Sequence, residues 1–396
     1  MARSPGPRNC ILTAPLSTIS SIPWENCAGG TSAMGVGRVL KGLVRMAPGS
    51  IHISRGDRIA WIDYAKGICL IAVVCFYTHY YVQDVTGSGW MQYWVDFARP
   101  FRMPDFFLIA GLFLARTIDR PWRDYLDKKV IHFTYFFVLW TTIYFAAELV
   151  LTQNLAGKPL WFEYLRWYVD PYHMLWFIAM LPVYFLVTRA LCGIPWWLVL
   201  AVAAVLQVWG PESGWRHLDR FSERFVYFYA GYALAPLVFQ LTDWVRRNRL
   251  QALAGLLVWA VINEAFVLAQ LHEGRGYSLV LGIAGASAVM VTGALLQGQR
   301  FMGWLRYLGQ NSIVVFLAFY IPMVAAAKLL WKLQPPLDPG SQALIITAVA
   351  TATPILVYWV VRRTPLSLIF QRPSWAKLGR PAPAVTLPAG ASPSTP

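Results

Sequence analysis

Long apolar blocks recur along this chain and constrain its fold more than any other feature of the sequence. Most run to about 20 residues, the length that an α-helix needs to cross a bilayer. In lipid every backbone amide bonds within its own helix or within a closed barrel, and the blocks lack the two-residue alternation of barrel strands. We place the blocks at 60–82, 94–115, 130–151, 174–191, 195–209, 224–241, 250–270, 277–297, 311–331 and 342–361.

Composition agrees with a chain that lies in lipid. Hydrophobic residues make up 57% of the chain and charged residues 13%, whereas roughly 25% of the residues of a soluble domain are charged. A soluble fold of 396 residues would need those charges on its surface. The sequence therefore predicts an all-α, polytopic membrane protein with about ten transmembrane helices.

The distribution of the basic residues, which give the chain a net charge of +15, decides the predicted topology. Lys and Arg gather in the short loops, and most of them share one side if the blocks alternate in direction. Cytoplasmic loops carry such an excess, so both termini are predicted to be cytoplasmic. Because topology accounts for the basic charge, we expect membrane lipids and no nucleic acid as partners.

The two ends of the chain differ from the blocks in composition. Residues 1–54 are rich in Pro, Gly, Ser and Thr and predict a disordered tail, or a start codon assigned too far upstream. A membrane domain is predicted over 55–378, and a second disordered tail, rich in Pro, Ala and Ser, over 379–396. The five cysteines show no metal-binding spacing, so we expect no metal.

Ionisable residues inside the predicted helices cost about 2.5–3.5 kcal/mol each on insertion scales, so each needs an explanation. Asp63 and Lys66 lie three residues apart in the first block, where they share a helix face and can pair. They form either an anchoring ion pair or a cytoplasmic entrance for an anionic substrate. His79, in the same block, is either an interfacial histidine among tyrosines or a general base.

Charges and prolines interrupt the second block. Arg99, Arg102 and Asp105 alternate there with Pro100 and Pro104. Prolines bend or break helices, and a broken helix at membrane depth is tolerated where it is buried in protein or lines a wet cavity. A turn at the membrane edge is the alternative. In a cavity, Arg102 would suit a phosphate or a developing oxyanion.

Several motifs of common enzyme classes are missing from the sequence. It contains no GxxxxGK[ST] phosphate loop, no HExxH zinc motif and no GxSxG nucleophile motif. ATP hydrolysis, zinc peptidase and serine hydrolase functions therefore have no support.

Five stretches, taken in order, resemble signatures of the acyltransferase 3 family of integral-membrane O-acyltransferases. They are WIDYAKGI (61–68), FRMPDFFLIAGL (101–112), HMLWF (173–177), ERFVYF (223–228) and GQNSI (309–313). The resemblance implies transfer of an acetyl or other short acyl group from acyl-CoA to a hydroxyl of a cell-surface glycan, a lipid or a small molecule. It also implies a multi-pass protein of the bacterial inner membrane, with acetyl-CoA as the expected co-substrate.

The resemblance also suggests the site residues. His79, Arg102 and Asp105 are the candidate catalytic residues, with His79 taking the proton of the acceptor hydroxyl and Arg102 stabilising the oxyanion. The candidate residues for binding acyl-CoA are Lys66, Arg116, Arg120 and Arg123.

Two positions depart from the family's pattern. Counted from Lys66, the position of the family's histidine is Tyr77, and His79 lies two residues further on, about 200° around a helix. Ala110 stands where the family has serine. A member with altered or lost activity is therefore an open alternative. So are a transporter or flippase for a glycan or lipid intermediate, and an interaction protein with a degenerate site.

Overall fold

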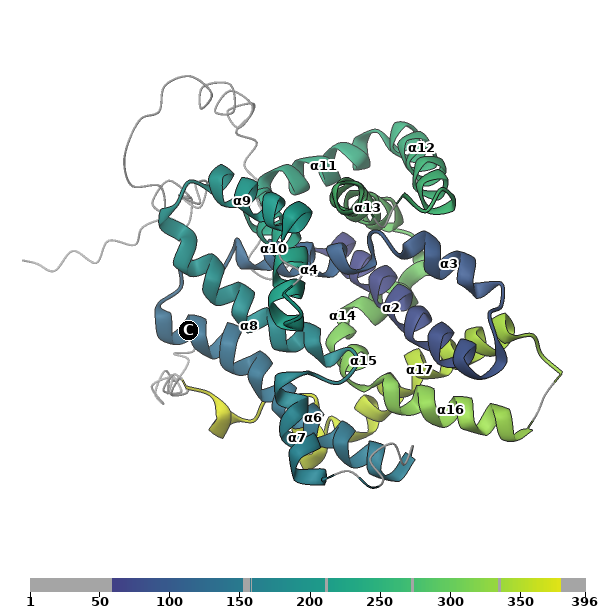
Figure 1. The fold of residues 1–396 in the computed structure, drawn as a ribbon. Coiled ribbons are helices and arrows are strands. Elements are labelled where there is room, and N and C mark those ends of the chain that lie inside the picture. Colours follow the sequence, from purple (N-terminus) through teal and green to yellow (C-terminus); the bar gives the residue numbers. More distant parts are fainter. Residues whose placement is uncertain are drawn as a thin grey trace, which may run out of the picture. The chain divides into compact units, whose positions relative to one another are not determined.

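Helices are the only regular elements that the computed structural model contains in its described residues (Figure 1). These are residues 59–151, 157, 159–210, 213–271, 274–333 and 336–378. Ile59–Leu191 and the described residues from Trp196 onward form one packed unit. The predicted tails 1–54 and 379–396, and the start of the predicted membrane domain, lie outside the described residues.

The helices of this unit follow one another with short connections. Their bounds are α2 (Ala60–Thr86), α3 (Met91–Ala98), α4 (Arg102–Leu114), α5 (Trp122–Tyr125), the π-helix η2 (Leu126–Ile131), α6 (His132–Leu151), α7 (Leu160–Val169), α8 (Leu175–Ala190), α9 (Trp196–Trp209), α10 (Arg216–Ala233), α11 (Ala235–Arg247), α12 (Arg249–Leu268), α13 (Arg275–Leu296), α14 (Gly303–Gln310), α15 (Ser312–Ala318), α16 (Tyr320–Leu333) and α17 (Pro339–Val361).

Six described helices are long and apolar enough to cross a membrane: α2, α5 continued through α6, α8, α12, α13 and α17. Two bent pairs raise this number to eight if each pair is one span: α10 with α11, bent by 70°, and α15 with α16, bent by 53°. The prediction of an all-helical protein with several membrane spans is thus confirmed. The number of ten spans and the cytoplasmic position of both termini stay predictions.

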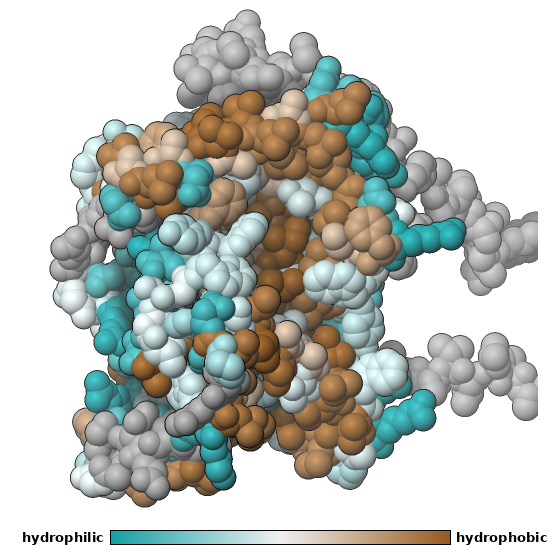
Figure 2. All heavy atoms as spheres, turned by 90° about the vertical axis from the view of Figure 1, so that its right-hand side faces the viewer, coloured by the Kyte–Doolittle hydropathy of each residue, from teal (hydrophilic) through white to brown (hydrophobic). Residues whose placement is uncertain are grey.

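The surface has the character expected of a chain in lipid. Hydrophobic side chains cover long stretches of the face in Figure 2. On α12, Leu257 and Val261 are 69% and 70% exposed. Exposure of this kind along an apolar helix fits contact with lipid tails and not with water.

The second predicted span is broken in two. α3 ends at Ala98 and α4 begins at Arg102. As its two prolines indicated, the block over 94–115 does not form one continuous helix. The break brings the charged residue Arg102 to the first turn of α4, inside the protein, where it is 7% exposed.

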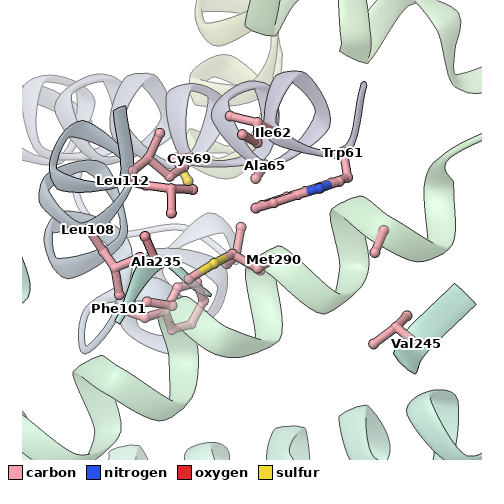
Figure 3. Close-up of a cluster of buried hydrophobic side chains, with 14 of the residues drawn as sticks. Trp61, Ile62, Ala65, Cys69, Phe101, Leu108, Leu112, Ala235, Val245 and Met290 are labelled. Carbon is pink, nitrogen blue, oxygen red and sulfur yellow. The ribbon is translucent and has the colours of Figure 1, made fainter. Parts of the chain in front are cut away.

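α2 is the helix around which several others gather. It packs against α4, α13, α14 and α17. Trp61 and Cys69 of α2 meet Leu112 of α4 and Met290 of α13 in a cluster of buried side chains (Figure 3). The cluster also includes Phe101, directly before α4, so it packs α4 against α2 and α13 along the length of α4.

Two glycines allow α4 and α10 to approach closely. A Cβ atom on Gly111 of α4 would collide with the carbonyl oxygen of Phe228, and one on Gly231 of α10 would collide with the carbonyl oxygen of Leu108. The contact is reciprocal, so backbone lies against backbone. α10 carries Arg220 and Arg224 and is therefore held beside the helix that carries Arg102.

Candidate active site

Arg102 lies at the centre of a polar cluster within the helical unit. Its guanidinium carbon is 3.6 Å from the centroid of the Phe76 ring of α2. Its Nε and Nη1 atoms are buried and have no hydrogen-bond partner among the described residues. Buried polar groups are nearly always hydrogen-bonded, so two unpartnered N–H groups on a buried cation indicate a place for a bound acceptor group.

Tyr77 connects Arg102 with α8 and α10. The indole N–H of Trp176 donates to the Tyr77 hydroxyl, and both Arg102 and Arg220 interact electrostatically with that tyrosine. The guanidinium of Arg220 lies 4.8 Å from the centroid of the Trp176 ring. Three other helices, α4, α8 and α10, therefore place side chains around one turn of α2.

Two further arginines add donors to the cluster. Nη1 of Arg220 and Nε of Arg224 are also buried without a partner among the residues described. Arg224 interacts electrostatically with Arg102 and pairs with its neighbour Glu223 at 3.4 Å. Three guanidinium groups with unused donors make this region suited to an anion or to an oxygen that gains negative charge.

A hydrogen-bonded chain of side chains borders the same turn of α2. Nε2 of His173 and the Tyr320 hydroxyl are 3.0 Å apart, and the hydroxyls of Tyr320 and Tyr172 are 3.2 Å apart. Tyr172 is also hydrogen-bonded to the buried Glu148. The ring of His173 lies edge to face with Tyr77, with centroids 6.2 Å apart. The backbone of His173 has a φ of 42°, in the left-handed region.

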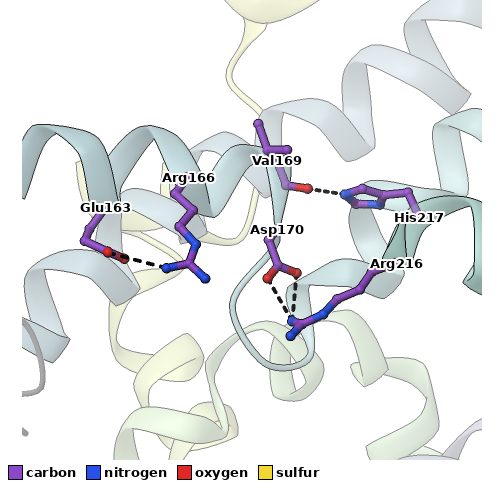
Figure 4. Close-up of polar contacts among 6 residues, drawn as sticks. All are labelled: Glu163, Arg166, Val169, Asp170, Arg216 and His217. Atoms are coloured by element: carbon purple, nitrogen blue, oxygen red, sulfur yellow. Dashed lines mark hydrogen bonds and ion pairs between the residues drawn. The ribbon is translucent and has the colours of Figure 1, made fainter. Parts of the chain in front are cut away.

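The loop that carries His173 is tied to the start of α10 (Figure 4). Nη1 of Arg216 donates to both carboxylate oxygens of Asp170, at 3.0 and 2.8 Å. The ring of His217 is hydrogen-bonded to the carbonyl oxygen of Val169. These contacts fix the loop before α8 relative to the helix that carries Arg220.

The described contacts of the other two predicted catalytic residues do not include Arg102. His79 is 3% exposed, and its described ring contact is with Tyr80. Asp105 is fully buried and accepts a hydrogen bond from the thiol of Cys69. Among the described residues no ion pair or hydrogen bond joins Arg102 to either of them, so their catalytic roles stay predictions.

The predicted acyl-CoA residues lie at the opposite end of α4. Lys66 is 4.4 Å from the centroid of the Phe113 ring and pairs with Asp63 at 4.0 Å, which confirms the predicted ion pair. The other three are exposed: Arg116 and Arg120 on the connection from α4 to α5, and Arg123 in α5 itself. The described residues contain no group of three or more His, Cys, Asp and Glu side chains suited to a metal, and the absence of a metal from the reaction stays a prediction.

Sequence reasoning did not assign His173, Tyr320 or Trp176 to the site. A signal existed for two of them, because His173 and Trp176 belong to the stretch HMLWF that resembles a family signature. Tyr320 had none, since it meets His173 across 147 residues of sequence. Arg224 stands in the resembling stretch ERFVYF and pairs there with its neighbour Glu223.

Comparison with known proteins decides the family. The sequence model of the family described as "Acyltransferase domain" matches residues 59–359. The chain belongs to this acyltransferase family. The resemblance to the acyltransferase 3 family, drawn from five short stretches, is thereby confirmed, and the matched residues include Arg102, Tyr77 and His173.

A curated relative supports this membership of the acyltransferase family. Inner membrane protein YcfT of Escherichia coli (strain K12) is 24% identical over 288 residues, which cover 65% of this chain and 77% of that relative. Its location and the membrane-length helices here agree with the predicted multi-pass protein of the inner membrane. No solved structure matches the chain.

Proposed function

We propose that this protein is an integral-membrane O-acyltransferase. It moves an acetyl or other short acyl group from acyl-CoA to a hydroxyl of a cell-surface glycan, a lipid or a small molecule. The observation that carries the proposal is Arg102, a buried cation whose Nε and Nη1 donors have no partner among the described residues, within a chain of the acyltransferase family.

Arg102 is suited to the charge that acyl transfer creates. Attack of a hydroxyl on a thioester gives a tetrahedral intermediate with a negatively charged oxygen. Preorganised donors in a site of low polarity stabilise such an oxyanion without reorganisation. The neighbouring donors of Arg220 and Arg224 add to the positive potential at the same place.

The cations at the two ends of α4 suit the two ends of acyl-CoA. Arg102 and Arg116 are 14 residues apart, which is roughly 20 Å along a helix. Acyl-CoA carries its phosphates at one end and its thioester at the other. In this proposal Lys66, Arg116, Arg120 and Arg123 attract the phosphates, while the thioester reaches Arg102.

A transporter or flippase for a glycan or lipid intermediate is the second candidate function. The bends of 70° between α10 and α11 and of 53° between α15 and α16 favour it, because discontinuous helices form the substrate sites of many transporters. Movement of a substrate without its acylation would identify this function.

The decisive experiment uses membrane vesicles that contain the full chain. They receive radiolabelled acetyl-CoA and extracted envelope glycans and lipids as acceptors. Wild type is compared with Arg102→Met at matched expression. Label in a hydroxyl ester with wild type and its loss in the variant support the proposal. No transfer from acetyl-CoA or longer acyl-CoA would contradict it and favour the transporter.

A further inference from the structure

The site holds a histidine that the proposed function has not yet used. We propose that His173 is the general base that takes the proton of the acceptor hydroxyl. A hydrogen-bond chain through Tyr320 and Tyr172 to Glu148 sets its tautomer and its orientation. This inference rests on the proposed acyl transfer and names the residue that performs one of its steps.

The chain of hydrogen bonds has a direction, which its last member fixes. In this proposal Glu148 is the accepting end of the chain, so the hydroxyl of Tyr172 donates to its carboxyl oxygen. The oxygen of Tyr172 then accepts from Tyr320, across 3.2 Å. The oxygen of Tyr320 is left to accept from Nε2 of His173, across 3.0 Å.

This direction leaves the imidazole in the form that a base needs. When Nε2 of His173 carries the proton, Nδ1 has a free lone pair. A carboxylate that orients a histidine through one ring nitrogen, so that the other can accept a proton, is the arrangement of the serine protease triad. Here two tyrosine hydroxyls stand between the carboxylate and the ring.

The position of His173 suits contact with a substrate. Its side chain is exposed, although aromatic rings of Tyr77, Tyr172 and Tyr320 surround it. Tyr77 touches His173 on one side and interacts with Arg102 on another. A substrate that lies over Tyr77 would therefore meet a proton acceptor and an oxyanion-stabilising cation together.

His79 lacks these features. It is 3% exposed, and the charged group described as interacting with it is Asp96. A general base has to come within hydrogen-bond reach of the proton that it removes. The exposure and surroundings of the two histidines therefore favour His173.

The proposed step balances in atoms and charge. The acceptor oxygen forms a bond to the thioester carbon while its proton moves to Nδ1 of His173. The tetrahedral intermediate then collapses, and its carbon–sulfur bond breaks. The CoA sulfur leaves with the electron pair of that bond and takes the proton from Nδ1, which returns His173 to its neutral form.

Matched histidine variants test the assignment. His173→Asn keeps a residue that tolerates the left-handed backbone, and His79→Asn is the control. We expect His173→Asn to lower acetyl transfer by about 10²- to 10⁴-fold, the usual contribution of a general base. His79→Asn should retain transfer, and Tyr320→Phe should lose part of it because the tautomer is no longer fixed.

Chemical rescue separates a catalytic role from a structural one. In His173→Gly, glycine accepts the positive φ, and added imidazole can occupy the space of the missing ring. We expect imidazole to restore part of the transfer in this variant and to leave the wild type unchanged. Elution in size-exclusion chromatography and thermal unfolding in detergent confirm that each variant is folded.

Three results would overturn the inference. Full transfer by His173→Asn with loss in His79→Asn would assign the base to His79. Loss in folded His173→Gly that imidazole does not restore would make His173 structural. Absence of transfer by the wild-type protein would remove the proposed function itself, and the inference with it, whereas the first two results leave that function standing.

Discussion

Arg216 holds Asp170 with a single nitrogen that donates to both carboxylate oxygens, and this pair links the first turn of α10 to the loop that carries His173. The side chains are 66% and 29% exposed. Exposed pairs contribute only about 0–1 kcal/mol to stability. The value of the contact therefore lies in the geometry that it fixes.

Arg216→Ala should lower acyl transfer while the protein stays folded. A small misplacement of reacting groups costs up to about 100-fold in rate, so we expect a loss of about 10- to 100-fold with little change in melting temperature. The charge-exchanged variant Asp170→Arg with Arg216→Asp should recover part of the rate. Equal rates in all three proteins would show that the pair does not position the loop.

Arg102→Met should lower transfer strongly without harming the fold. Removing an oxyanion donor costs about 10²- to 10³-fold in rate. Methionine of similar length also removes a buried, incompletely hydrogen-bonded charge, and such replacements are often neutral or stabilising. Radiolabel transfer and thermal unfolding in detergent measure the two effects.

A conservative variant at the same position refines that test. Arg102→Lys keeps the charge but loses the planar fork of donors, so it should retain only part of the transfer. A large drop in melting temperature for Arg102→Met would contradict the view that this cation serves a ligand and not the fold.

Close packing of α4 on α10 gives a prediction for stability. Gly111→Ala places a methyl group where the Phe228 carbonyl lies, so the helices have to separate. We expect a loss of about 1–3 kcal/mol, the usual cost of overpacking. Thermal unfolding in detergent measures this loss.

Gly255 of α12 provides the matched control for Gly111. A Cβ atom there meets nothing within 4 Å, and alanine favours a helix over glycine by about 1 kcal/mol. Gly255→Ala should therefore leave the melting temperature unchanged or raise it. Similar melting temperatures for both variants would show that α4 and α10 do not need their close contact.

A buried ion pair holds the segment after α17 onto the π-helix η2. Arg372 donates to the carboxylate of Asp127 at 2.6 Å and to its carbonyl oxygen at 2.7 Å, and the two side chains are 5% and 12% exposed. Breaking one partner of a buried pair costs about 3–5 kcal/mol, because the other charge stays buried.

Arg372→Ala should therefore lower the melting temperature in detergent markedly. Arg363→Ala is the control, since Arg363 is exposed and joins no described ion pair, and such surface changes usually stay within about 0.5 kcal/mol. A melting temperature of Arg372→Ala that equals that of Arg363→Ala would contradict the structural role of the pair.

Much of the fold could be predicted from hydrophobicity alone. The blocks 60–82 and 342–361 correspond to α2 and α17, because uninterrupted apolar sequence of membrane length has only one stable form in lipid. The bends within 224–241 and 311–331 were missed. Each is followed by a proline, Pro236 or Pro322, in the first turn of the next helix, where its missing N–H costs nothing.

Those prolines alone would not have predicted the two bends. Pro182 and Pro354 lie inside α8 and α17, which continue through them. At the second bend, the Tyr144 hydroxyl donates to the carbonyl oxygen of Leu317, so a side chain from α6 satisfies backbone near the break. Such compensation comes from tertiary contacts that a single sequence does not reveal.

The site was predictable only in part for the same reason. The charges between prolines identified Arg102 as a candidate, because a charge inside a membrane span is costly and such residues are usually functional. Spacing along α2 indicated that His79 and Tyr77 point in different directions. The pairing of His173 with Tyr320 joins the loop before α8 to the start of α16, and it leaves no local pattern in either segment.

The left-handed backbone of His173 has a consequence for how this protein could be improved. A residue other than glycine in that region stores strain of order 1–3 kcal/mol. Glycine there would relieve the strain, so selection of variants for thermal stability alone would favour the loss of this side chain. Thermal tolerance and acyl transfer would then diverge at one codon, and a screen that scores both would show it directly.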